Sequence, residues 1–346
     1  MSQISASTTA SAGRRKRKTE LTKKILKAVA ACTPPLLGLI TIAGLSVSQA
    51  NRKYKEADII TTGIQKIDQF KTLIYALERE RGFTCTVLSG RLANLDSKEM
   101  TSLENTLKLK YRETDKAIQF IQSVFTDQEN QVHLMQLIQN VNNYRYSVSS
   151  NTATCTDILK QYTEELDYYM KHLNDGFKES ETGHFWQAIH LYEKVLITQD
   201  YYGLQRALGA AFFLVGFDQV SSAHYVEVTA TAYHFIKVVI SDPNLQTQYD
   251  KLRIKHADNQ RKFTAMKAII EANRCNLDDA SNSSQKLSNE FFALGTANIQ
   301  MIAELGSNID DDILKSMAAE KSSASTNLGV AIVLTIGISL IVPPVL

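Results

Sequence analysis

Arg81 stands in a row of apolar residues that recur every seven positions. The row contains Ile60, Ile67, Ile74, Arg81 and Leu88. A spacing of seven returns to nearly the same face of a helix, so Arg81 occupies a position that the pattern otherwise gives to an apolar side chain. A guanidinium is always charged and is rarely buried without a partner. The row therefore predicts that Arg81 meets either a carboxylate of the protein or an anion from outside.

Two further polar residues interrupt apolar faces in the same way. Arg206 belongs to a second row with the same spacing, which contains Tyr192, Gln199, Arg206 and Phe213. Asn298 belongs to an apolar stripe near the end of the chain, which contains Phe291, Leu294, Asn298, Ile302, Leu305 and Ile309. Two arginines and an asparagine that face one interior form a pocket rich in hydrogen-bond donors. Such a pocket suits a small anion.

Ordinary structural roles remain open for each arginine. Arg81 can pair with Glu78, three residues earlier on the same helix, and such a surface pair contributes about 0.2–0.5 kcal/mol. Arg206 can pair with Asp200 or with an acidic residue of a neighbouring helix. Arg79 is two residues from Arg81, so it points to roughly the opposite side of the helix, toward solvent. An arginine that is neutralised inside the protein does not require an external anion.

The sequence lacks the motifs of common enzymes and metal sites. It contains neither a glycine-rich phosphate-binding loop nor a His-Glu-x-x-His motif. His184 and His190 are six residues apart, so they point to different faces of a helix and cannot chelate one metal ion. The formal net charge of +2 argues against a nucleic-acid-binding protein. We therefore predict no catalytic residue, no metal site and no cofactor in this chain.

The cysteines leave the disulfide state open. Cys32 lies in an apolar segment, which leaves Cys85, Cys155 and Cys275 as candidates. At most one disulfide can form among three cysteines, with one thiol left over. Cys155–Cys275 is one conceivable pair, and buried free thiols are equally compatible with the sequence.

The elements that position these residues are predicted to be long helices. The chain has only 5 prolines and 15 glycines, and the helical period dominates between its two apolar ends. Asp242-Pro243-Asn244 marks a break between two helices. Eight helices joined by short loops predict an all-α fold of two packed four-helix bundles. Their expected ranges are 54–89, 97–125, 127–146, 153–177, 184–217, 221–240, 245–274 and 284–317.

Apolar segments near both ends of the chain are long enough to span a bilayer. We predict a disordered basic cytoplasmic tail at 1–24, transmembrane helices at 25–48 and 327–346, and an extracellular domain at 49–326. The basic residues at 14–18 place the N-terminus in the cytoplasm by the positive-inside rule. A removable signal peptide ending at Ser48-Gln49-Ala50 is the alternative for the first segment. We expect an output domain beyond the second span, and a complete two-span protein is the alternative.

Two motifs resemble the signatures of a known family. Leu77-Glu78-Arg79-Glu80-Arg81-Gly82 resembles the first signature of the NIT domains, which are nitrate- and nitrite-sensing modules. Asp200-Tyr201-Tyr202-Gly203-Leu204-Gln205-Arg206-Ala207-Leu208 is similar to the second signature, in which an arginine follows a glycine. The segment 291–305 resembles the closing part of the domain, and 34–39 resembles the membrane helix that usually precedes it. The resemblance covers nearly all of 54–317.

The resemblance implies a helical domain that holds nitrate or nitrite by arginines between long helices. By position these arginines are Arg79, Arg81 and Arg206, and Asn298 stands where a basic residue is expected. In the family the domain is joined to response regulators, sensor kinases, chemoreceptors and animal membrane guanylate cyclases. A glycosylation sequon at Asn282 favours the guanylate cyclase architecture.

These expectations combine into a two-pass receptor of the cell membrane. Its partners are the lipid bilayer, nitrate or nitrite and a second copy of the chain, with no nucleic acid, and its output is a cytoplasmic guanylate cyclase. One alternative is the same fold with another ligand or a protein partner, and with internally paired arginines. Another is a receptor cyclase or kinase whose catalytic part lies beyond this chain.

Overall fold

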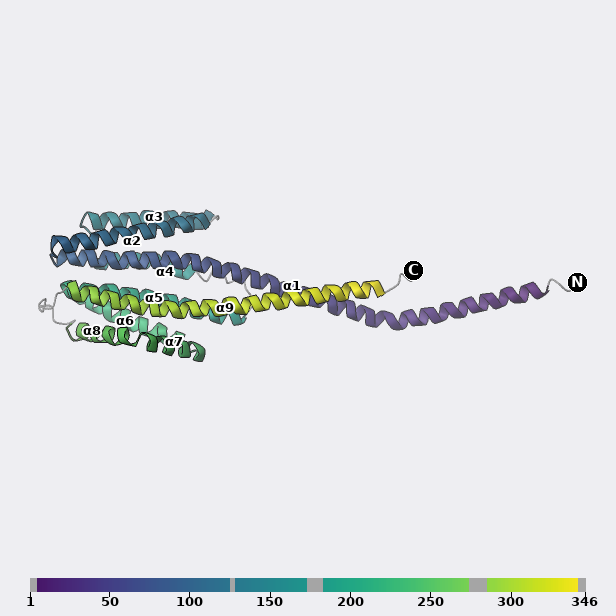
Figure 1. Ribbon diagram of the computed structural model, residues 1–346. Coiled ribbons are helices and arrows are strands. Elements are labelled where there is room, and N and C mark those ends of the chain that lie inside the picture. The colour runs from purple at the N-terminus through teal and green to yellow at the C-terminus, as the bar shows by residue number, and fades with distance from the viewer. Residues whose placement is uncertain (1–4, 125–127, 173–182, 274–284, 342–346) are drawn as a thin grey trace. The chain divides into compact units, whose positions relative to one another are not determined.

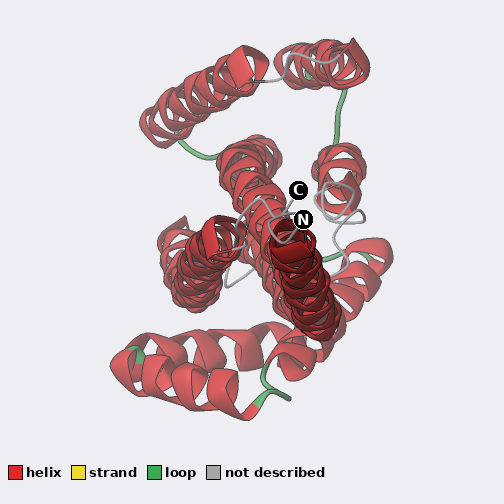
Figure 2. Ribbon diagram, turned by 90° about the vertical axis from the view of Figure 1, so that its right-hand side faces the viewer, coloured by secondary structure: helices red, strands yellow, loops and turns green. Residues whose placement is uncertain are grey.

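The computed structural model describes residues 5–124, 128–172, 183–273 and 285–341. Within these ranges all regular secondary structure is helical and no strand is present (Figure 2). The all-α prediction is therefore confirmed. The chain divides into two units, one comprising Met1–Asp58 with Ser316–Leu346 and the other comprising Ile59–Lys315. The residues that the sequence singles out lie in the second unit, apart from the predicted membrane segments.

The helices follow one another along the chain (Figure 1). Their bounds are α1 Ser5–Leu92, α2 Ser97–Val124, α3 Gln128–Ser149, α4 Cys155–His172, α5 Gly183–Val215, α6 Gln219–Val239, α7 Pro243–Lys255, α8 Ala257–Asn273 and α9 Gln285–Ile341. For α2 to α6, the predicted bounds agree within about three residues at the ends that the structure describes.

Aspartate caps explain two of these helix starts. Asp96 precedes α2, and its carboxylate accepts a hydrogen bond from the backbone N–H of Glu99 at 2.8 Å. Asp242 precedes α7 and accepts from the next two free N–H groups at 2.9 and 3.1 Å, while Pro243 occupies the first turn. These caps satisfy N–H groups that have no partner inside the helix. They confirm the break that the sequence predicts at Asp242-Pro243-Asn244.

One predicted element is wrong. The expected helix at 245–274 is two helices, because α7 ends at Lys255 and α8 begins at Ala257. His256 lies between them with φ −104° and ψ 18°, outside the α-helical region. The break contains neither glycine nor proline, so no helix-breaking residue marks it in the sequence. Hydrophobic periodicity could not reveal it either. The ion pair of Lys255 with Glu304 on α9, at 2.6 Å, holds this point against the neighbouring helix.

The long terminal helices α1 and α9 each contain segments that the sequence predicts as separate elements. α1 begins at Ser5, within the tail expected to be disordered, and runs through 25–48 without a break. α9 contains the predicted helix at 284–317 and continues to Ile341. Between the two segments of the first unit, Lys321 pairs with Asp58 at 2.9 Å, and Ala50 and Ala324 are buried. Among the described residues, no helix has a stretch long and apolar enough to cross a membrane.

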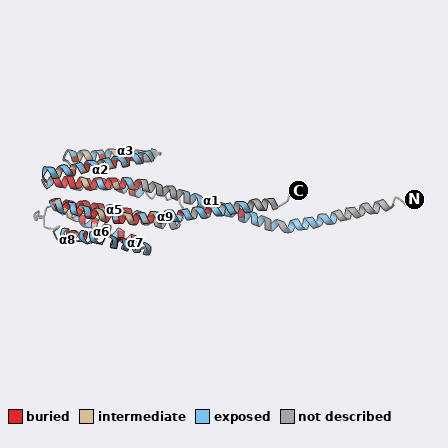
Figure 3. Cartoon of the chain, in the orientation of Figure 1, coloured by how far each residue is buried: buried red, intermediate tan, exposed pale blue. Residues whose placement is uncertain are grey.

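Two helices, α1 and α5, have long buried stretches in the unit Ile59–Lys315 (Figure 3). α1 is buried on nearly every side from Ala76 to Gly90, apart from Arg79 and the half-buried Phe83. α5 is buried continuously from Gly203 to Ala211. A helix that is buried all round occupies a central position rather than a surface one. Polar side chains in these stretches therefore face other helices, and the site is built there.

Candidate functional site

Arg81 is fully buried on α1 and contacts two other helices. Its Nη2 lies 2.6 Å from Oδ1 of Asp200 on α5 and also donates to the Asp200 carbonyl at 3.3 Å. Its Nη1 donates to the hydroxyl of Thr163 on α4 at 2.9 Å. The Nε atom has no hydrogen-bond partner among the described residues. Of the partners left open by the sequence, the carboxylate that meets Arg81 is thus that of Asp200, and Glu78 does not pair with it.

Arg206 on α5 is also buried, with 4% of its surface exposed, but its surroundings differ. Its Nη1 donates to the Thr296 hydroxyl on α9 at 3.0 Å, and its guanidinium lies 4.4 Å above the ring of Phe292. Within the described part of the chain, Arg206 forms no ion pair with a carboxylate, and its Nε has no partner. Arg206 is therefore a buried cation held by a hydroxyl and an aromatic ring.

Glycines make room for both guanidinium groups. A methyl group placed on Gly82 of α1 would lie 3.2 Å from Nη2 of Arg206, and one on Gly203 of α5 would lie 3.4 Å from Nη2 of Arg81. On α9, a methyl group at Gly295 would approach Cγ of Arg206 to 2.8 Å. Each motif thus supplies one arginine and the glycine beside the other arginine. The sequence carried a signal for the role of these glycines, because each motif contains both an arginine and a glycine. The sequence-based prediction did not include them.

Glu78 lies on the same face of α1 and carries a perturbed carboxyl group. It is 4% exposed, and its Oε1 has no hydrogen-bond partner among the described residues. Burial, assisted by the negative charge of Asp200, raises the pKa of Glu78 to about 8, although Arg81, Arg206 and Arg79 oppose this rise. At pH 7 the carboxyl group is thus mostly protonated and neutral.

The buried group carries more positive than negative charge. Burial is also the largest effect on Arg206 and lowers its pKa to about 10, so its guanidinium stays charged at pH 7. Arg81 and Arg206 contribute two positive charges and Asp200 contributes one negative charge, while neutral Glu78 contributes none. One positive charge is left over in a region of low dielectric, where an unpaired charge is costly. An anion can remove this cost.

The other predicted site residues lie elsewhere. The side chain of Arg79 is 55% exposed, and its Nη1 lies 3.7 Å from Oε2 of Glu113. Arg79 is two residues from Arg81 on the helix, so it points away from the face of Arg81. Asn298 is buried, but its amide oxygen accepts from Gln260 of α8, and its side chain also bonds to Tyr202. The structure thus brings Arg81 and Arg206 together and leaves Arg79 and Asn298 outside. Asn282 lies outside the described residues.

The family model described as nitrate and nitrite sensing (NIT) matches residues 72–314. This chain belongs to the NIT family. The matched range contains both arginine motifs and the buried residues that contact the two guanidinium groups. The NIT resemblance drawn from the two motifs is therefore confirmed.

A solved structure supports the fold of this NIT domain. The structure of the NasR transcription antiterminator is similar with a TM-score of 0.52 and 12% sequence identity, over 87% of this chain and 83% of that chain. At this identity the similarity shows the fold alone. A comparison with curated proteins found no match.

A second buried carboxylate of the NIT domain is fully partnered. Glu80 accepts two hydrogen bonds from Arg145 of α3, each at 2.8 Å, and one from the Tyr162 hydroxyl of α4 at 2.5 Å. Arg145 also pairs with Asp115 of α2 at 2.7 Å. These contacts join α1 to α3 and α4, and α3 to α2. Glu80 therefore has a structural role next to the two arginines, which the sequence analysis did not recognise.

A disulfide joins α1 to the first residue of α4. It links Cys85 with Cys155, rather than the conceivable pair Cys155–Cys275. Cys275 lies outside the described residues. Cys85 is one helical turn after Arg81, and α4 carries Thr163, which accepts from Arg81. The disulfide thus holds together two of the helices that contact this guanidinium.

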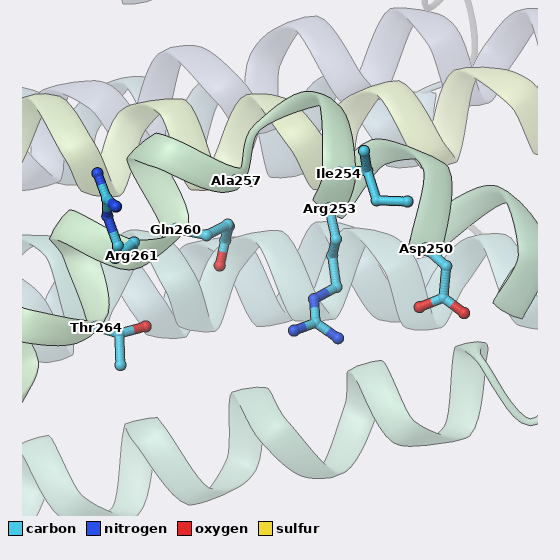
Figure 4. A pocket seen from close by; sticks show the side chains of 7 residues that line it. All are labelled: Asp250, Arg253, Ile254, Ala257, Gln260, Arg261 and Thr264. Carbon is cyan, nitrogen blue, oxygen red and sulfur yellow. The ribbon is translucent and has the colours of Figure 1, made fainter.

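The NIT domain also has a surface groove along α7 and α8, with a volume of about 640 Å³ (Figure 4). Its lining residues are Asp250, Arg253, Ile254, Ala257, Gln260, Arg261 and Thr264. The groove contains neither Arg81 nor Arg206. The groove is therefore distinct from the buried site. The excess charge of the buried site, and its atoms without hydrogen-bond partners, make that site the stronger candidate for ligand binding. Among the described residues, no cluster of three or more His, Cys, Asp or Glu side chains could hold a metal ion.

Proposed function

We propose that this NIT domain senses nitrate or nitrite by binding one anion beside Arg206, with Arg81 as the second cation of the site. The observation that carries the proposal is the burial of Arg206 without a carboxylate partner in the described residues. A buried guanidinium gains most from an anion when the anion replaces both the missing charge and the missing hydrogen bonds.

The shape of the ligand fits the groups that are available. Nitrate and nitrite are small, planar and delocalised, and a guanidinium presents its N–H groups in one plane. The Nε atoms of Arg81 and Arg206 have no partner among the described residues. The Phe292 ring contacts the guanidinium of Arg206, with its centroid 4.4 Å from Cζ. One monovalent anion balances the single positive charge in excess, whereas a divalent anion such as sulfate would leave a negative charge.

Isothermal titration of the full chain with nitrate, nitrite and sulfate tests this proposal. We expect heat of binding with nitrate or nitrite at a stoichiometry of about one per chain, and weaker binding of sulfate. Absence of binding heat with both nitrogen oxyanions, from protein that is folded by circular dichroism, would reject the assignment.

A second candidate function is the recognition of another ligand or a protein partner. It is favoured by the ion pair of Arg81 with Asp200, because that arginine is already neutralised inside the protein. Arg206 separates the two candidates, since only the anion-sensing proposal gives this residue its counter-charge. Loss of nitrate binding in Arg206→Met, with the fold retained, supports the first candidate.

We propose further that the domain works as part of a membrane receptor. The arrangement consists of two four-helix bundles at 49–326, outside the cell, between spans at 25–48 and 327–346. The apolar composition of both segments and the basic residues at 14–18 support it. In this proposal the receptor is a homodimer, and α9 passes the change at Thr296 toward a cytoplasmic guanylate cyclase.

Extraction of cell membranes with alkaline carbonate tests the membrane arrangement. A chain with two spans stays in the pellet, and a tag placed before residue 14 is protected from protease added outside the cell. Recovery of the chain in the supernatant would contradict the two spans and leave the anion site unaffected.

A further inference from the structure

Glu78 lies near both guanidinium groups of the site and pairs with neither. It is three residues before Arg81 and four before Gly82, whose backbone borders Nη2 of Arg206, so all three positions share one face of α1. Its charge acts on that of Arg206, and both arginines act on the charge of Glu78. Within the described residues, however, Glu78 forms no ion pair, and Oε1 is buried without a partner.

This arrangement is unusual for a carboxylate between two cations. A buried carboxylate normally accepts paired hydrogen bonds from the nearest guanidinium. Glu80, two residues away, does so with Arg145, and the Asp200 carboxylate accepts one hydrogen bond from Arg81. Oε1 of Glu78, in contrast, is buried without a hydrogen-bond partner in the described residues, beside an arginine that has no counter-charge. Its carboxyl group is therefore free to contact a ligand that Arg206 also contacts.

We propose that Glu78 is itself a ligand of the anion and that it binds as a neutral carboxylic acid, whose hydroxyl donates a hydrogen bond to the anion. The inference rests on the proposed function, because it concerns the same site. If Glu78 is ionised before binding, the anion binds together with one proton from solvent. That proton forms the O–H bond of the carboxyl group, and no other bond forms or breaks.

Charge balance explains why the neutral form is required. When Glu78 is neutral, the buried group has one positive charge in excess, and a monovalent anion completes it. When Glu78 is ionised, the two arginines are balanced by Glu78 and Asp200, and the anion meets a carboxylate instead of a donor. Burial raises the pKa of Glu78 to about 8. Nitrate affinity should therefore be nearly constant below pH 7 and fall about tenfold per pH unit above pH 8.

Other ionisable groups near Glu78 set the range of the measurement. The pKa of Tyr75 is raised above its usual value, mainly by burial, and that of Arg206 is lowered to about 10. A comparison between pH 6.5 and pH 9.0 therefore stays below the pKa of Arg206, which remains mostly charged at both pH values. The charged and titratable groups that face Glu78 or its neighbours are Tyr75, Arg79 and Arg81 on α1, Asp167 on α4, Asp200 and Arg206 on α5, and Asp310 on α9.

The test is titration calorimetry of the full chain with sodium nitrate at pH 6.5 and pH 9.0, the latter in two buffers of different ionisation enthalpy. For the natural chain we expect affinity about 10-fold weaker at pH 9.0 and uptake of nearly one proton per nitrate. Glu78→Gln keeps an N–H donor that does not titrate, so its affinity should be the same at both pH values within about twofold, without proton uptake.

Two more variants make the test specific. Glu78→Met fills a similar volume without a donor, so we expect nitrate affinity about 10-fold weaker at pH 6.5 and independent of pH. Glu290→Gln removes the same charge from an exposed position on α9 and should keep the pH dependence of the natural chain. Circular dichroism verifies the fold of each variant, and the natural chain alone decides the outcome where a variant does not fold.

Each outcome has one meaning. Nitrate binding to the natural chain that is equally tight at both pH values overturns the role of Glu78 and leaves the proposed function standing. A pH dependence that persists in Glu78→Gln also overturns it, since another group must then titrate. Absence of binding of both nitrate and nitrite at both pH values removes the proposed function and the role of Glu78 together.

Discussion

The two buried arginines differ in what balances their charge. Arg81 has the Asp200 carboxylate at 2.6 Å and the Thr163 hydroxyl at 2.9 Å. Arg206 has the Thr296 hydroxyl and the Phe292 ring. A buried ion pair is strongly destabilised when one partner is removed, whereas removal of a buried charge that has no partner relieves a cost of desolvation. The two arginines should therefore respond oppositely to substitution.

Replacement of Arg206 by methionine should weaken ligand binding without loss of stability. Methionine fills the space of the arginine stem and carries no charge, so the free energy of unfolding without anion should be unchanged or higher by up to about 2 kcal/mol. Nitrate affinity should fall at least ~10-fold, because charge-assisted hydrogen bonds are lost. Urea denaturation and calorimetry measure the two effects. A marked loss of stability without anion would indicate that Arg206 is neutralised inside the protein.

Replacement of Arg81 by methionine should destabilise the fold. The Asp200 carboxylate would remain buried without its partner, which costs about 3–5 kcal/mol. The double variant Arg81→Met with Asp200→Leu should recover most of this loss, because neither charge remains. Urea denaturation of both variants checks the expectation. Equal stability of the single variant and the natural chain would show that the pair contributes nothing.

At the scale of the helices, the site depends on close packing of α1, α5 and α9. Gly82, Gly203 and Gly295 lie where a methyl group would approach a guanidinium or its stem. Gly209 has a different neighbour, because a methyl group there would lie 2.2 Å from Cε1 of Phe291. Glycine in a helix costs roughly 0.5–1 kcal/mol relative to alanine. These glycines are therefore required by helix contacts rather than by helix formation.

Gly295→Ala should weaken anion binding by displacing Arg206. The new methyl group would lie 2.8 Å from Cγ of Arg206, so the arginine must move, and nitrate affinity should fall roughly tenfold. Gly209→Ala is the matched control, since it strains the same helix pair at Phe291 and should cost about 1–3 kcal/mol of stability without changing affinity. Calorimetry at a temperature where both variants are folded separates the two. Equal nitrate affinities of Gly295→Ala and Gly209→Ala would argue against a role of the contact at Gly295 in positioning Arg206.

The disulfide should contribute substantially to the stability of the helix bundle. It closes a loop with a sequence separation of 70, for which chain entropy predicts a stabilisation of about 4 kcal/mol. Cys155→Ala and the double variant with Cys85→Ala should therefore lose similar amounts, measured by guanidinium denaturation. If added reductant leaves the natural chain as stable as before, the cross-link has no such role.

At the scale of the whole molecule, the ligand should stabilise the folded chain. An anion that binds only the folded state adds about 2.7 kcal/mol at a concentration one hundred times its Kd. For a domain of this size, that corresponds to a rise in Tm of roughly 5–10 °C. Thermal denaturation in sodium nitrate, with sodium sulfate at equal ionic strength as control, measures this. The rise should be absent in Arg206→Met, and a rise of equal size there would place the anion elsewhere.

The sequence by itself determined the helical class, most helix bounds and the burial of Arg81, Arg206 and Asn298. These follow from local physics, because helical periodicity assigns each side chain to a face and capping residues mark the ends of helices. The same spacing placed Arg79 on the opposite side from Arg81. The family also followed from the sequence, since both motifs are continuous along the chain.

Only the tertiary structure decided which groups meet. Asp200 was one of the possible partners of Arg206, yet it pairs with Arg81, and Asn298 contacts α8 instead of the arginines. The Cys85–Cys155 disulfide and the break at His256 also could not be deduced. Periodicity determines which face of a helix is buried, but the rotation and axial position of each helix against its neighbours determine which side chains touch. Those two quantities depend on packing of the whole core.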